Sequence, residues 1–364
     1  MSIQFYLAVI LSTLMSACLA WVEVEDRAMG LDLTLTYGTA VLWTSNATSN
    51  VAMIEGSPQY RSAMSNLVRY SSPDAEDVSI RRPWFCRYFP SLQRCTPDED
   101  LVAVADMLRA LRTACDDFAG VPVPYCGDST PIPLRWDGGA DQSTFISAAI
   151  DFAELPRPGI RRAFAGAAAA MANGASNCTF GMSCEADRGW NDPTEVRAVL
   201  AIDYSQEVLT TSLMSAEEND LDAEYFETRF DLGAASLSSQ DDPQEHWREV
   251  KGSIKRALAY TMRALTIYGP PLQREALHVV VYGDAVGTAG LKTALQECLE
   301  PYEPGFVVLP EDRKMADPIF AAAEGAVAFV DPTEDLVHEL AGPIDGVFTL
   351  DKWWLESRYP EEEL

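Results

Sequence analysis

The stretch Ala28–Trp43, AMGLDLTLTYGTAVLW, decides the fold of this chain. Apolar and β-branched residues dominate it, and Gly38 interrupts the run. This composition, broken once by a glycine, predicts two strands that begin a hairpin. The only acidic residue of the stretch is Asp32, and taken alone it can be interpreted as a carboxylate that caps its own hairpin.

Downstream of this stretch, helical and strand patterns alternate along the chain. The segment from Asp98 to Ala119 carries Leu101, Val104 and Leu108 at helical spacing, which predicts an amphipathic helix. Residues 215–245 are acidic and polar, and we expect an irregular excursion there. Further helices are expected at 141–152, 160–171, 247–265, 288–299 and 317–329, and strands at 196–214 (a pair), 278–282 and 306–309. The alternation predicts an α/β fold.

The N-terminus predicts entry into the secretory pathway. An apolar run of about 16 residues extends from Phe5 to Ala20, which is short for a membrane span and suits a cleaved signal peptide over residues 1–20. A retained membrane anchor and a bacterial lipoprotein signal are the alternatives. No later stretch is long and apolar enough to span a bilayer. We therefore expect a protein that is secreted, or held in the lumen of the secretory pathway, with no membrane span after cleavage.

The charge of the chain excludes one class of partner. Its 27 Lys and Arg residues face 55 Asp and Glu residues, for a net charge of −28. A surface with this excess of negative charge repels the phosphate backbone of nucleic acids. We expect no nucleic-acid partner, and the nature of a protein partner stays open.

The cysteines and sequons fit an oxidising compartment. Six cysteines form pairs that are close in sequence, which favours three loop-closing disulfides, although buried free thiols remain the alternative. The chain has no Cys-x-x-Cys motif and its three histidines are isolated, so a structural zinc site is not expected. The expected disulfides are Cys86–Cys95, Cys115–Cys126 and Cys178–Cys184, and the expected N-glycosylation sites are Asn46 and Asn177.

The order of the motifs resembles the nucleotide-binding domain of Hsp70 chaperones, in the actin-like ATPase superfamily. No single motif is specific, but their order along the chain matches that family. The matching stretches are the first phosphate hairpin Gly30–Tyr37, the helix end Ala119–Val123, the strand Ile132–Trp136 with the helix from Asp141, the connection Ala165–Ala170, the second phosphate hairpin Asp203–Val208, the strand end Tyr282–Gly283 and the last helix Ala323–Ala326.

The resemblance implies a two-lobed actin-like fold with a cleft between the lobes. It places the first lobe at residues 28–195, the second lobe, with one subdomain trimmed, at 196–340, and a tail at 341–364. It also implies ATP or ADP with magnesium in the cleft. Asp32 and Asp203 would be the residual catalytic carboxylates. The implied nucleotide contacts are Thr34, Leu35, Thr36, Tyr37, Ser205, Gln206, the base-sandwiching pair Lys255 and Arg256, Gly283 and Asp284.

The two phosphate hairpins depart from the pattern of the family. Phosphate loops use glycine because the backbone must approach the oxygens closely. Here Thr34 replaces a glycine of the first hairpin, and Ser205–Glu207 replace three glycines of the second. A Glu207 carboxylate ~4 Å from a phosphate would cost about 4 kcal/mol at an effective dielectric near 20. The glutamate that the family places near the metal is Ala165 here.

These departures favour a pseudo-ATPase that serves as a secreted binding or scaffold protein, with either ATP or ADP and magnesium as its cofactor or no cofactor at all. The alternative is an ATP-binding protein with weak ATPase activity. A sugar kinase of the same superfamily would need a catalytic Asp in a loop of the second lobe, and the sequence offers none that is convincing. A serine hydrolase is disfavoured because the chain lacks Gly-x-Ser-x-Gly.

Overall fold

The computed structural model describes residues 27–44, 47–70, 98–131, 140–156, 163–173, 198–217, 220–238, 242–268, 277–301, 307–308 and 316–330. The expected signal peptide and C-terminal tail lie outside these residues. So do Asn46, Asn177 and the pairs Cys86–Cys95 and Cys178–Cys184. Within the part of the chain that is described, no helix is long and apolar enough to cross a membrane.

The first lobe is built on a five-stranded sheet in the order β3-β2-β1-β4-β5. The central strand β1 pairs antiparallel with β2 and parallel with β4, and β3 extends the antiparallel side as the third strand of a meander. The strands are β1 (Arg27–Leu33), β2 (Tyr37–Thr44), β3 (Ala47–Glu55), β4 (Tyr125–Thr130) and β5 (Ala163–Phe164). The hairpin predicted from Ala28–Trp43 is therefore confirmed as β1 and β2.

The second lobe repeats the same arrangement. Its sheet has the order β8-β7-β6-β9-β10, with β6 central, antiparallel to β7 and parallel to β9. The strands are β6 (Ala198–Tyr204), β7 (Leu209–Glu217), β8 (Asp220–Arg229), β9 (Leu277–Tyr282) and β10 (Val307–Val308). Two sheets of identical strand order, each with its own core cluster, confirm the two-lobed α/β fold of the actin-like type.

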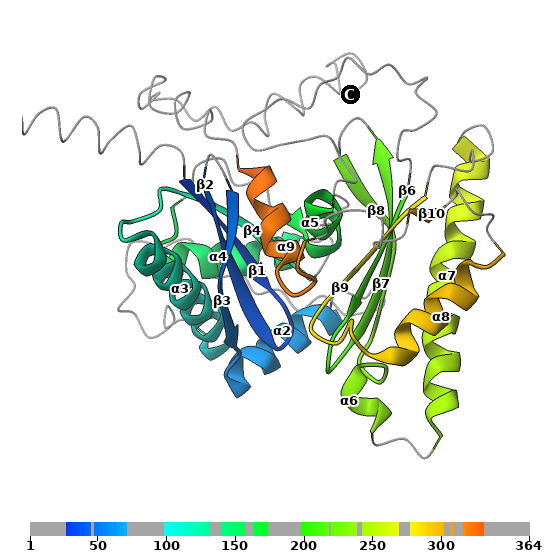
Figure 1. The fold of residues 1–364 in the computed structure, drawn as a ribbon. Helices are drawn as coiled ribbons and strands as arrows, with labels where there is room; N and C mark the ends of the chain where they lie inside the picture. Colours follow the sequence, from blue (N-terminus) through cyan, green and yellow to red (C-terminus); the bar gives the residue numbers. More distant parts are fainter. Residues whose placement is uncertain are drawn as a thin grey trace, which may run out of the picture.

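Helices cover both sheets on their outer sides and fill the space between them (Figure 1). In the first lobe, α3 (Glu99–Ala119) packs between β2 and the helices α2 (Pro58–Tyr70) and α4 (Ala140–Ala153). In the second lobe, α7 (Pro243–Tyr268) packs on β7 and β8 and contacts α8 (Ala289–Leu299). The short α6 (Ala234–Leu237) follows β8, and α5 (Ala165–Ala172) and α9 (Ala321–Ala326), which continues as a 3-10 turn (Val327–Phe329), lie between the sheets.

The helices α5 and α9 cross between the lobes. The helix α5 follows the first sheet in sequence but packs on β6 and β9 of the second, whereas α9 follows the second sheet and packs on β1 and β4 of the first. Their contact is backbone to backbone, since a Cβ on Gly325 would lie 1.7 Å from the carbonyl oxygen of Ala168. The alanine-rich sequence of both helices is what allows this approach.

Two segments differ from the expectation drawn from the sequence. Residues 220–229 form β8, an edge strand, where an irregular excursion was expected. The side chains of β8 alternate between its two faces, although the segment is rich in acidic residues. Phe226 contacts Phe164 on one face, whereas Tyr225 and Glu227 face α7 on the other. The other is β4, which pairs parallel with β1 and was not among the expected strands, whereas the strand expected at Ile132–Trp136 lies outside the described residues.

The expected Cys115–Cys126 bridge is not formed. Both residues are free thiols buried in the core of the first lobe, with Cys115 on α3 and Cys126 on β4. The Cys115 sulfur lies 4.0 Å from the carbonyl oxygen of Val41, and burial raises the pKa of this thiol to about 12. Because disulfide exchange needs the thiolate, such a thiol is inert and packs as a small apolar side chain.

Candidate functional site

The two predicted phosphate hairpins are the turns β1–β2 and β6–β7, and they occupy equivalent places in their sheets. Asp32 pairs with Thr39 in the first hairpin, and Asp203 pairs with Thr210 in the second. Each aspartate is the last but one residue of the central strand of its lobe. The two carboxyl groups therefore lie at equivalent positions in the two lobes.

In the first turn, the Thr34 side chain closes the loop on itself. The Thr34 hydroxyl donates to the carbonyl oxygen of Tyr37 (2.7 Å) and accepts from the backbone N–H groups of Tyr37 (3.0 Å) and Thr36 (3.3 Å). The Thr34 N–H donates to the Tyr37 carbonyl (3.0 Å). The N–H groups of Thr34, Thr36 and Tyr37 thus have acceptors within the turn.

The second turn repeats this arrangement and adds a carboxylate. The Ser205 N–H and hydroxyl both donate to the carbonyl oxygen of Val208, at 3.0 and 3.2 Å. The Gln206 N–H donates to Oδ1 of Asp284 at 2.9 Å. The Asp284 carboxylate therefore occupies the position in which an anionic ligand would accept from the Gln206 N–H.

Helix α2 supports the first turn, and it was not among the helices expected from the sequence. Ser57 and Pro58 begin the helix, and the Ser57 hydroxyl accepts from the Tyr60 N–H at 3.1 Å. The buried Tyr60 hydroxyl donates to the carbonyl oxygen of Thr34 at 2.7 Å. The spacing of Tyr60, Ala63, Met64, Leu67 and Val68 after a Ser-Pro start was the signal that could have predicted this helix.

Asp32 is sealed from solvent. Its side chain is 2% exposed, and Oδ1 accepts a hydrogen bond of 2.6 Å from the Ser129 hydroxyl on the neighbouring β4. Burial raises the pKa of Asp32 to about 7, although the bond from Ser129 lowers it. A carboxyl with this pKa is partly protonated near neutral pH.

The charges that gather at the end of β6 are negative. Burial raises the pKa of Asp203 well above its usual range, and the charges of Asp32 and Asp284 raise it further. Burial raises the pKa of Tyr37 above its usual range, and the same three carboxyl groups raise it further. No basic side chain is among the groups that shift the pKa of Asp203, so none of them would offset the charge of a polyphosphate at this site.

Gly283 follows β9 with a φ of 111°, a backbone conformation that side chains rarely adopt. A Cβ there would lie 2.5 Å from the carbonyl oxygen of Tyr204 and 2.6 Å from Oδ1 of Asp203. The missing side chain therefore allows the Gly283 backbone to lie close to the end of β6.

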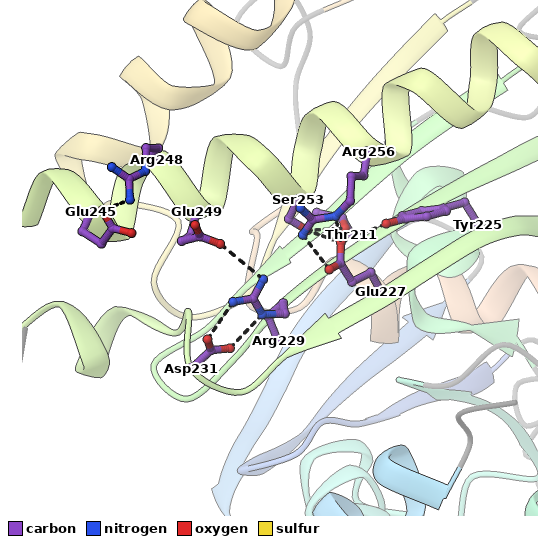
Figure 2. Close-up of polar contacts among 10 residues, drawn as sticks. All are labelled: Thr211, Tyr225, Glu227, Arg229, Asp231, Glu245, Arg248, Glu249, Ser253 and Arg256. Carbon is purple, nitrogen blue, oxygen red and sulfur yellow. Dashed lines mark hydrogen bonds and ion pairs between the residues drawn. The ribbon is translucent and has the colours of Figure 1, made fainter. Parts of the chain in front are cut away.

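The structure does not bring the predicted base-binding pair to Gly283. Figure 2 shows that Arg256 of α7 points toward the Glu227 carboxylate of β8. Arg256 donates two hydrogen bonds to this carboxylate, of 2.7 and 3.2 Å. The hydroxyls of Ser253 and Tyr225 each donate to it at 2.9 Å. In the order β8-β7-β6-β9, β8 is three strands from β9, about 14 Å. Lys255 is exposed on α7. This geometry fits a solvated basic face of α7 in which Arg256 forms a structural ion pair with Glu227.

The residues present do not fit a magnesium nucleotide, although the actin-like fold typically holds one between its lobes. The N–H groups of Thr36, Tyr37 and Gln206 already have acceptors within the protein. Leu35 and Val208 are buried in the apolar cluster of the first lobe. Among the described residues, no group of three or more His, Cys, Asp or Glu side chains is placed to hold a metal ion.

No protein-family model matches the chain, and no curated protein matches it. Among solved structures, its fold is similar to the crystal structure of ethanolamine utilization protein EutJ from Carboxydothermus hydrogenoformans. The two chains share 11% sequence identity, the match covers 83% of this chain and 89% of that chain, and the TM-score is 0.44.

Proposed function

We propose that this chain is a pseudo-ATPase: an actin-like fold that no longer uses nucleotide and serves as a binding or scaffold protein for a protein partner. The observation that carries the proposal is that backbone N–H groups of both phosphate turns already donate to the protein itself: those of Thr36 and Tyr37 to the Thr34 hydroxyl, and that of Gln206 to Asp284. A phosphate would have to displace these bonds and enter beside Asp203 and Asp284.

The test is a titration of ATP, ADP and adenosine with magnesium into the purified full chain by calorimetry, together with a hydrolysis assay. We expect no magnesium-dependent hydrolysis above background and no saturable ATP binding in the micromolar range. A turnover near 1 s⁻¹, within the ordinary range for enzymes, would refute the proposal and establish the alternative, a functional ATP-binding protein.

A repaired variant makes the titration more informative. Replacing Thr34 with Gly and Asp284 with Ala frees the N–H groups of Thr36, Tyr37 and Gln206 and removes one negative charge. We expect ATP affinity to rise at least about tenfold, or 1.4 kcal/mol, while adenosine affinity does not change. Asp117→Ala, at an exposed position of α3, removes the same charge away from the turns and is the matched control.

We further propose that the protein works in the secretory pathway. The apolar N-terminal run and the sequons at Asn46 and Asn177 support this. Expressed in eukaryotic secretory cells, the chain is expected in the medium without its first 20 residues or so. Its mass should fall on treatment with an N-glycosidase. Retention of the N-terminal run in the mature protein, or an unchanged mass, would argue against this compartment.

A further inference from the structure

Besides the crossed helices α5 and α9, helix α2 of the first lobe contacts the second lobe. Arg61 of α2 lies 3.5 Å from the Glu207 carboxylate in the second turn, and Arg69, two turns further along α2, lies over the ring of Phe230 with 4.8 Å to its centroid. Figure 1 shows α2 at the foot of the first lobe, next to the strands of the second. The two arginines lie on α2 of the first lobe, and the side chains that they contact, Glu207 and Phe230, belong to the second.

Between these two contacts, an apolar side chain crosses from one lobe to the other. Val208 belongs to the second turn, yet it is 1% exposed and buried in the core cluster of the first lobe. Phe230 is partly buried against the same cluster. The second turn is thus anchored in the first lobe by an apolar residue next to a charged pair.

The backbone behind the second turn is fixed as well. The Ala234 N–H donates to the carbonyl oxygen of Ser205 (2.9 Å), and the Ala235 N–H donates to that of Gln206 (2.8 Å). A Cβ on Gly233 would lie 2.4 Å from the Val208 nitrogen, so this segment is pressed against the turn. Arg61 is held in place by Gly56, whose carbonyl oxygen accepts from its Nε at 3.0 Å.

We propose that α2 and the second turn form an interlobe clasp, made of Arg61, Arg69, Glu207, Val208 and Phe230, that holds the two lobes closed without nucleotide. Glu207 stands where the sequence resemblance places a phosphate-binding glycine, and its carboxylate binds the opposite lobe directly. The inference rests on the proposed function, since it explains how a pseudo-ATPase keeps a fixed shape for a partner.

The clasp is tested by reversing its charges. Arg61→Glu places a carboxylate beside Glu207 and near Glu55, which also lies 3.7 Å from Arg61, and Glu207→Arg places two cations together. The double variant Arg61→Glu, Glu207→Arg restores an ion pair of opposite direction. Both side chains are more than a third exposed, so the variants are expected to fold.

The readout is amide hydrogen exchange in the peptides that contain residues 34–37 and 205–208. An exposed ion pair contributes up to about 1 kcal/mol, so each single reversal should speed exchange about fivefold in both turns. The double variant should return to within about twofold of the wild type. Exchange in β9 should be unchanged in all variants. Arg248→Glu, which breaks the exposed Arg248–Glu245 pair on α7 away from the clasp, is the matched control and should leave both turns unaffected.

Single variants that exchange like the wild type, or a double variant no slower than the singles, would overturn the clasp. A separate arm adds ATP and magnesium to the wild type. Protection of the two turns by nucleotide would overturn the proposed function and leave the result of the charge reversal standing. The two failures are therefore distinguishable.

Discussion

Replacing Asp32 with Asn is expected to stabilise the protein at pH 8 and to leave its stability at pH 4 nearly unchanged. The pKa of Asp32 is about 7 in the folded protein, against 3.8 for the ordinary side chain. Between these values the folded state binds the proton more tightly than the unfolded state does. The free energy of unfolding of the wild type therefore falls as the pH rises from about 4 to about 7.

An asparagine at this position carries no charge at any pH in this range, and its amide oxygen can still accept the bond from Ser129. A shift of about three pKa units corresponds to about 4 kcal/mol at pH 8, as an upper bound for the gain. Asp203 remains in the variant and has a raised pKa of its own, so the pH dependence should become smaller without vanishing.

Urea unfolding of wild type and variant at pH 4, 6 and 8 measures this effect. Asp117→Asn, at an exposed position of α3, is the control and should follow the wild type at every pH. A variant that is less stable than the wild type at pH 8 would mean that the ionised carboxylate of Asp32 is needed. That result would favour a metal-binding role and count against the pseudo-ATPase.

Replacing Gly325 with Ala is expected to destabilise the protein by about 3 kcal/mol or more, at the top of the range for overpacked sites. The added Cβ would lie 1.7 Å from the carbonyl oxygen, 2.3 Å from the carbonyl carbon and 2.8 Å from the Cα of Ala168. All three atoms are backbone, so no side-chain rotation relieves the overlap. The helices α5 and α9 must therefore move apart, which weakens the contact between the lobes.

The same substitution in another helix should have the opposite sign. Gly252 lies in α7, and the nearest atom to its added Cβ is Nη1 of the flexible Arg256 side chain at 3.4 Å. Gly252→Ala should therefore stabilise the protein by up to about 1 kcal/mol, through helix propensity alone. Urea unfolding of both variants under one set of conditions gives the comparison. Equal effects at the two sites would show that the close packing of α5 on α9 is not needed for stability.

The sequence predicted the fold because its signals are local and repeated. The hairpin at Ala28–Trp43, the buried strand Val199–Ile202 and the helix after Asp98 each follow from periodicity, composition and caps within a few residues. The side chain of Asp98 accepts from the Asp100 N–H, and Gly120 ends the helix with a φ of 70°. The alternation of these elements was enough to predict the α/β class, and the resemblance to the Hsp70 nucleotide-binding domain implied the two lobes and the equivalent places of Asp32 and Asp203.

The sequence could not show where the hydrogen-bond donors and charges of the turns are directed. It showed that Thr34, Ser205 and Glu207 replace glycines, but only the tertiary structure reveals that Thr34 closes its own turn and that Glu207 binds Arg61. Asp284 is 78 positions from the Gln206 N–H that it accepts from, and Arg256 is 29 positions from Glu227. No local pattern encodes such contacts.

By itself, then, the sequence determined the α/β class and the two hairpins, because strand and helix periodicity is a property of neighbouring residues. The tertiary structure alone decided that Cys115 and Cys126 stay reduced, that Asp32 is sealed against Ser129, and that α2 joins the second turn. These outcomes depend on burial and on contacts between distant segments, which arise only when the two sheets and the crossed helices between them are assembled.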